Sequence, residues 1–308
     1  MKQKLLPILL LLLANPWFAA AEESEKPVIY VPVPPYVFLF EQLAGEWVDV
    51  RAIVGKGDDP HEYSPTPGQL VKLSSSRMIC SGELGFEANF FVKVGDGENA
   101  PEEFSLLDGL ELLEGFCDHP SHRKDASGDS AGREKEEEHH DHEDLHDPHV
   151  WLSPRMMAEL AERAAAKLVE VVPSREREIG KNLAVFRKRL LGLDKELRVI
   201  LEESADRKFY VYHGAFAYFA RDFGLEQIAV ELGNRRPTPK AVAQLAKRAK
   251  EDGVTTIFAQ PQFDKSSAKA LAEAIGGEVA TLDPLEEDVF ANLRRIAGAI
   301  AGREVLSN

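Results

Sequence analysis

Residues 179–200, with the sequence IGKNLAVFRKRLLGLDKELRVI, decide the fold class of this chain. Apolar side chains recur here at alternating intervals of four and three residues, which places them on one face of an α-helix. The stripe consists of Ile179, Leu183, Phe186, Leu190, Leu193, Leu197 and Ile200. A helix of about 28 residues is roughly 40 Å long, long enough to pack along more than one unit. We therefore expect residues 175–204 to form a linker helix between two lobes.

Short apolar runs alternate with helical stretches on both sides of this helix. Such alternation predicts parallel strands in open α/β sheets. We expect strands at 28–33, 48–54, 78–80, 106–113, 209–212, 228–232, 254–259 and 279–282, with a helix at 86–92 among those between them. The predicted fold is α/β with two lobes, residues 22–174 and 205–308, each with an open, mostly parallel sheet flanked by helices.

The first 21 residues have the order typical of a secretory signal peptide. Lys2 and Lys4 begin an apolar run at residues 5–13, and the small residues 19–21 follow it. The run is too short to span a bilayer, and no cysteine follows the expected cleavage site to carry a lipid anchor. We therefore expect a periplasmic protein that is exported by this signal peptide and is not lipid-anchored.

The composition is strongly acidic. The formal charge is −15, from 37 lysines and arginines against 52 acidic residues. This balance argues against nucleic acid or an anionic membrane as a partner and favours attraction of cations. Cys80 and Cys117 are the only cysteines, and a disulfide or two lone buried thiols are equally open.

Seven of the nine histidines fall between His119 and His149. Residues 118–147 are otherwise acidic and nearly free of apolar side chains, so we expect a mobile loop. Its imidazoles are predicted to bind zinc weakly as an accessory site; the alternative is a solvated acidic insertion without selective binding. These residues are His119, His122, His139, His140, His142 and His146.

The segment from His142 to His146 matches the H-E-x-x-H motif of zinc proteases. That motif works on a helix, where its two histidines face one metal and the glutamate activates water. Because this tract has no apolar face that would hold a helix in place, we interpret the match as accidental.

Four metal-binding side chains stand at or just beyond expected strand ends. They are His61, His149, His213 and Asp283. Each histidine alone is more often a turn or capping residue than a ligand. Ligands of open α/β sheets, however, bind outside the carboxyl ends of the strands, so two lobes would bring these groups together. Three imidazoles and one carboxylate form a tetrahedral site that suits zinc.

Several segments resemble the zinc and manganese binding-protein family of bacterial metal ABC importers, which includes the periplasmic zinc-binding component. The resemblance covers nearly the whole mature chain, and its most specific segment is DPHVWLSP at 147–154. The others are DPHEY at 59–63, SGELGFE at 81–87, HGAFAYF at 213–219, FAQPQF at 258–263 and LDPL at 282–285.

The resemblance implies two α/β lobes joined by a long rigid helix, with the metal between them. It implies that the ligands are His61, His149, His213 and Asp283. In this family, a histidine at the third of these positions, here His213, goes with zinc and a glutamate goes with manganese. In one variant of the family a carboxylate beside the first histidine reaches the metal, and Glu62 is the neighbour here. The resemblance also accounts for the histidine-rich loop, which is common in the zinc subgroup.

These observations predict a high-affinity Zn²⁺-binding protein, not an enzyme, that delivers its ion to a membrane permease. The chain has no phosphate-binding G-x-x-x-x-G-K-[ST] loop, so a separate chain must supply the ATPase. We expect a monomer. The alternatives are a manganese-binding member of the same family, a secreted zinc hydrolase with an open coordination position for water, and a metal-buffering or adhesive surface protein.

Overall fold

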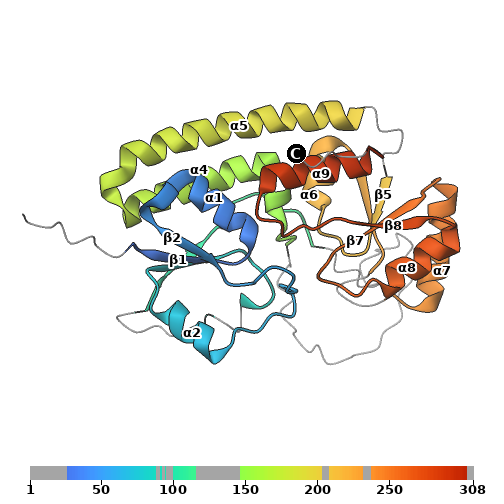
Figure 1. Ribbon diagram of the computed structural model, residues 1–308, viewed down its shortest axis with the longest axis horizontal. Helices are drawn as coiled ribbons and strands as arrows, with labels where there is room; N and C mark the ends of the chain where they lie inside the picture. Colours follow the sequence, from blue (N-terminus) through green and yellow to red (C-terminus); the bar gives the residue numbers. More distant parts are fainter. Residues whose placement is uncertain are drawn as a thin grey trace, which may run out of the picture.

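A computed structural model describes residues 26–87, 91, 94, 100–115, 146–202, 208–231 and 237–303. The predicted signal peptide, Cys117 and most of the histidine-rich segment lie outside these residues. Two four-stranded sheets are described, with the orders β2-β1-β3-β4 and β6-β5-β7-β8. Every strand pair is parallel. The two lobes therefore repeat one topology, as the alternation of strands and helices predicted (Figure 1).

The first sheet consists of four short strands, and helices connect the first three of them along the chain. Its strands are β1 (Val28–Val31), β2 (Asp49–Ala52), β3 (Met78–Ser81) and β4 (Glu102–Ser105). Helix α1 (Pro34–Ala44) follows β1 and ends at Gly45, whose φ of 56° suits a glycine. Helix α2 (Pro67–Ser74), which we did not predict, begins with a capping box between Thr66 and Gln69.

The predicted fourth strand at 106–113 is wrong. The strand is β4, which pairs with β3 in the register Met78↔Glu102. Strand β4 lies at the edge of the sheet and pairs with a neighbour on one side only. This edge position suits its largely polar side chains. The apolar residues Leu106 and Leu107 follow it and are buried in the core. Their hydrophobicity reflects burial of a loop and not strand pairing. The predicted helix at 86–92 lies largely outside the described residues.

The boundaries of the second sheet's strands agree with the predicted positions to within three residues. Its strands are β5 (Lys208–Val211), β6 (Glu226–Ala229), β7 (Thr256–Ala259) and β8 (Glu278–Thr281). Its helices are α6 (Ala217–Phe223), α7 (Pro239–Glu251), α8 (Ser266–Ile275) and α9 (Val289–Ile300). Short 3₁₀ helices are η1 (Gly45–Trp47), η2 (Val150–Leu152) and η3 (Pro173–Arg175).

Helices α4 (Pro154–Val171) and α5 (Glu176–Glu202) connect the lobes. The 27 residues of α5 run above both sheets (Figure 1). On the buried face of α5, Phe186 contacts Phe38 of α1 and Phe290 of α9, with ring centroids 6.1 and 5.5 Å away. One continuous apolar core contains residues of both sheets and of α5. The predicted connecting helix is confirmed, and its packing opposes wide separation of the lobes.

No helix in the described part of the chain has both the length and the apolar character that crossing a membrane requires.

Candidate metal centre

His61 lies in the loop that follows β2. Its backbone N–H donates to the Oδ1 atom of Asp59 at 2.8 Å, which closes a tight turn, and its side chain is partly buried. Burial, together with the neighbouring His213 and His149, lowers the pKa of His61 to about 2. The imidazole is therefore neutral at physiological pH and has a lone pair for a metal ion.

His149 precedes η2 and is fixed by the acid of its own motif. The Oδ1 atom of Asp147 accepts from the His149 backbone N–H at 2.9 Å and lies 2.7 Å from ring atom Nδ1. Both residues are buried. Burial lowers the pKa of His149, an effect that Asp147 opposes and His213 adds to. The hydrogen bond at Nδ1 leaves Nε2 for a metal ion.

His213 comes two residues after β5, at the carboxyl end of the strand. Gln260, fully buried, accepts from the His213 backbone N–H at 3.1 Å and donates to its carbonyl at 2.8 Å. The ring stacks on Phe263 with centroids 4.8 Å apart, and its Nδ1 contacts the carboxylate of Glu231. These contacts hold the backbone, the ring plane and the Nδ1 edge of this histidine.

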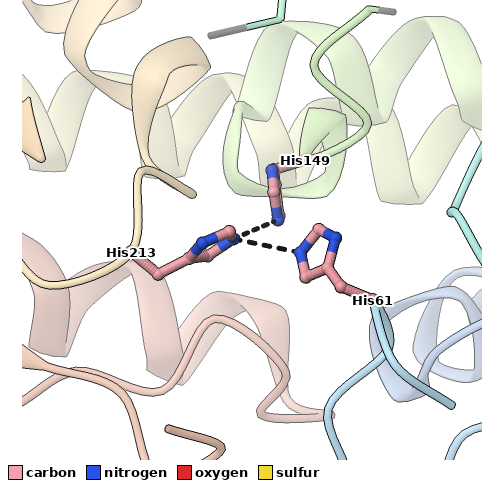
Figure 2. Close-up of side chains that lie close together, drawn as sticks. All are labelled: His61, His149 and His213. Atoms are coloured by element: carbon pink, nitrogen blue, oxygen red, sulfur yellow. Dashed lines mark hydrogen bonds between the residues drawn. The ribbon is translucent and has the colours of Figure 1, made fainter. Parts of the chain in front are cut away.

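The three rings converge on one point between the lobes (Figure 2). The Nε2 atom of His213 is 3.1 Å from that of His61 and 3.3 Å from that of His149. Nitrogen ligands about 2.0–2.1 Å from a tetrahedral zinc ion are about 3.3 Å apart. The spacing of the imidazoles therefore matches the geometry of zinc, and the structure brings together three of the four predicted ligands.

A cavity of about 10 Å³ lies at this point. Besides the histidines it is lined by Pro60, Gln262, Phe263, Pro284 and Leu285. Such a volume holds about one water-sized particle. The site therefore has room for a dehydrated ion but not for a hydrated one.

Asp283 is not part of the three-histidine group. Its Oδ1 atom accepts from Nε2 of Gln262 at 2.7 Å and from the backbone N–H of Leu285 at 2.9 Å. The next two residues, Pro284 and Leu285, line the cavity. The ligand role of Asp283 thus stays a prediction. Glu62 is exposed and lines a neighbouring pocket instead.

Of the predicted accessory ligands, the structure describes only His146. It is exposed, forms an isolated bridge with Glu114, and has its Nδ1 atom 3.5 Å from a carboxylate oxygen of Glu83. It is not part of the three-histidine group. The other five loop histidines, the start of the H-E-x-x-H match among them, lie outside the described residues.

Two buried acids at the site were not predicted as functional. Asp147 stood in the quoted motif without a role, and Glu231 was missed altogether. Glu231 lies two residues beyond β6, which neighbours β5 in the sheet. Since the carboxyl ends of parallel strands share one edge, an acid just after the neighbouring strand was the signal that could have identified it.

This fold and this three-histidine site define a metal-binding protein of the two-lobed type that serves ABC importers as substrate-binding component. The family model described as zinc-uptake complex component A, periplasmic (ZnuA), matches residues 29–300, and the chain belongs to this family.

Known proteins agree with this assignment. A crystal structure of ZnuA is 32% identical, with a TM-score of 0.79 over 91% of this chain and 100% of that one. A zinc-bound deletion mutant of ZnuA is also 32% identical, with a TM-score of 0.77 over 92% and 100%. The zinc-binding protein AdcA of Streptococcus pyogenes serotype M3 is 26% identical over 306 residues, covering 92% of this chain. This chain spans 58% of the streptococcal protein.

Proposed function

We propose that this protein captures one Zn²⁺ ion on His61, His149 and His213 and delivers it to the permease of a metal ABC importer. The observation that carries the proposal is the convergence of three Nε2 atoms at spacings of 3.1 and 3.3 Å, which fits tetrahedral zinc. Membership of the zinc-uptake family supports zinc as the ion, and the solved and curated relatives are named for zinc binding.

The electrostatics of the site favour tight binding. Protons compete with metal ions for imidazole, and the lowered pKa values of His61 and His149 remove that competition near neutral pH. We propose Asp283 as the fourth ligand, because its loop borders the cavity and its hydrogen bonds to Gln262 and Leu285 use only Oδ1, which leaves Oδ2 to bind the ion after a rotation of the side chain. Glu62 or a water molecule is the alternative.

Binding and release involve only small movements of the lobes in this proposal. The linker helix α5 packs against a core that both sheets share. Opening the lobes widely would expose buried rings such as Phe186 and Phe290, each of which contributes on the order of 2 kcal/mol or more through burial. We expect zinc-free and zinc-bound protein to give nearly superimposable X-ray scattering curves. A change of several ångströms in radius of gyration would contradict this.

Transport is favoured over the other functions. A secreted zinc hydrolase needs an open position for water, which a fourth protein ligand closes, and the matched family takes up zinc. Manganese prefers oxygen ligands, whereas the group found here consists of three imidazoles. We place the protein in the periplasm as a monomer that docks on a permease with a separate ATPase. We also propose the histidine-rich segment as a weak accessory zinc site.

A competitive zinc titration of the mature chain tests the proposal. The variants are His213→Ala, a deletion of residues 119–145 and, as a matched control, His146→Ala. We expect one tight site that survives the deletion and the control and is lost in His213→Ala. If deleting the loop abolishes binding while His213→Ala retains it, the cleft assignment is wrong and the loop is the primary site.

A further inference from the structure

Glu231 is a buried acid that touches the metal site without facing the cavity. Glu231 is 7% exposed, and its backbone N–H donates to the carbonyl of Tyr212 at 3.0 Å. Its carboxylate contacts Nδ1 of His213. Among the residues that the structure describes, no lysine or arginine forms an ion pair with it. Burying a carboxylate without a partner is costly, and the partner that the structure describes for Glu231 is the ring of His213.

The contact with Glu231 decides which nitrogen of His213 carries the proton. A carboxylate accepts hydrogen bonds, so Nδ1 is the protonated atom and Nε2 keeps its lone pair. That lone pair faces the Nε2 atoms of His61 and His149 (Figure 2). The other tautomer would direct an N–H group at the ion. An acid at the outer nitrogen also makes the imidazole a stronger ligand.

Charge gives a second reason. Three imidazoles and the carboxylate of Asp283, the proposed fourth ligand, bring only one negative charge to a dication in a small buried cavity, where an uncompensated charge is strongly unfavourable. Asp147, which is 4% exposed, lies 2.7 Å from Nδ1 of His149. Together with Glu231 it puts two negative charges one imidazole ring away from the ion.

Resting on the proposed function, we infer that Glu231 is a positioning residue of the zinc site. It holds His213 in the tautomer that binds zinc and, with Asp147, offsets the charge of the bound ion. Loss of its carboxylate should therefore weaken zinc binding and alter the coordination of the bound ion, whereas loss of a merely structural residue would change stability alone.

The test compares Glu231→Ala and Glu231→Gln with the unmodified mature protein. The matched control is Glu226→Gln, at the start of strand β6 that precedes Glu231, where an exposed carboxylate pairs with Arg248 at 2.7 Å. Zinc affinity is measured by competition with a chelator, and coordination geometry by the visible absorption of bound Co²⁺. The thermal midpoint of the zinc-free protein reports the fold.

We expect Glu231→Ala to lose 10- to 100-fold in zinc affinity, the range for removal of an acid behind a metal-binding histidine. Glu231→Gln should lose less, because its amide oxygen still accepts from Nδ1–H. Both variants should alter the Co²⁺ spectrum. Glu226→Gln should match the unmodified protein in affinity and spectrum.

Unchanged zinc affinity in both Glu231 variants would overturn the inference. So would an affinity loss that comes with a lowered zinc-free midpoint and an unchanged Co²⁺ spectrum, since that pattern indicates damage to the fold. Failure of the proposed function looks different: the unmodified protein would then lack a tight zinc site, or His213→Ala would retain it.

Discussion

Replacement of Trp151 by phenylalanine tests whether one side chain ties the metal site together across the lobes. Trp151 is fully buried in η2, and its Nε1–H donates to the carbonyl of Pro284 at 2.8 Å. It is two residues from His149, and Pro284 follows Asp283 directly. The indole therefore fixes the distance between the loops that bear these two predicted ligands.

The magnitude follows from what phenylalanine lacks. The substitution leaves the buried carbonyl of Pro284 without its donor, which costs about 1–3 kcal/mol. It also removes one ring of the indole, which packs edge-on against Tyr36 and His149 at 5.5 and 5.3 Å. The resulting small cavity costs roughly 1–2 kcal/mol more. We expect the free energy of unfolding to fall by about 2–5 kcal/mol, a large part of the total for an ordinary domain.

Urea unfolding of the zinc-free protein measures this loss, and a zinc titration measures its consequence for binding. Trp47→Phe is the control, because Trp47 is only partly buried and its ring contacts Arg175 instead of a metal ligand. We expect the control to lose less than half as much stability and to keep its zinc affinity. The reasoning would be refuted if the free energy of unfolding of Trp151→Phe were within about 0.5 kcal/mol of that of the unmodified protein, the range of ordinary surface substitutions.

Two further predictions concern pH and the rate of zinc capture. The pKa of His61 is lowered to about 2 from the 6.5 of an unfolded histidine, so the unfolded state binds more protons between these two pH values. The zinc-free protein should therefore lose stability as the pH falls below about 6.5. Urea unfolding at a series of pH values measures this loss, which His61→Gln should reduce. Glu62 is exposed and lines, with Asp59 and Glu231, a pocket of about 190 Å³ next to the zinc cavity. Glu62→Gln should slow zinc association in stopped-flow measurements at low salt, with little effect at high salt; an equal slowing at both would show that its charge does not attract the ion.

The fold was largely predictable because its decisive signals are periodic. The stripe on α5 has one explanation, and α1 and α6 end at glycines, the residue type most common just after a helix. The edge strand β4 could not be found in this way. Its sequence, Glu102–Ser105, has no apolar alternation, and only pairing with β3 makes it a strand. Hydrophobicity pointed instead to the buried loop that follows.

The site was predictable only in part, for a related reason. His61, His149 and His213 stand out in the sequence because histidine is rare outside the acidic segment, although the structure places His149 before η2 and not at a strand end. Glutamate is abundant in this chain, so Glu231 does not stand out from exposed counterparts such as Glu226 unless the order of the strands is known. Its burial and its contact with His213 arise from the order of strands in the sheet. Residues that contact a metal-binding side chain without contacting the metal are therefore revealed by the structure and not by the sequence.

The distribution of these supporting contacts also bears on how zinc is bound and released. His149 and His213 each have a buried acid at Nδ1, and Gln260 holds the backbone of His213 on both sides. His61 is held by one backbone hydrogen bond to Asp59 and is more exposed than the other two. Folding has thus already fixed two ligands, which lowers the entropy that binding must still remove. The core shared by both lobes restricts the remaining freedom to the loop of His61, so a permease that moves this loop would weaken the site without separating the lobes.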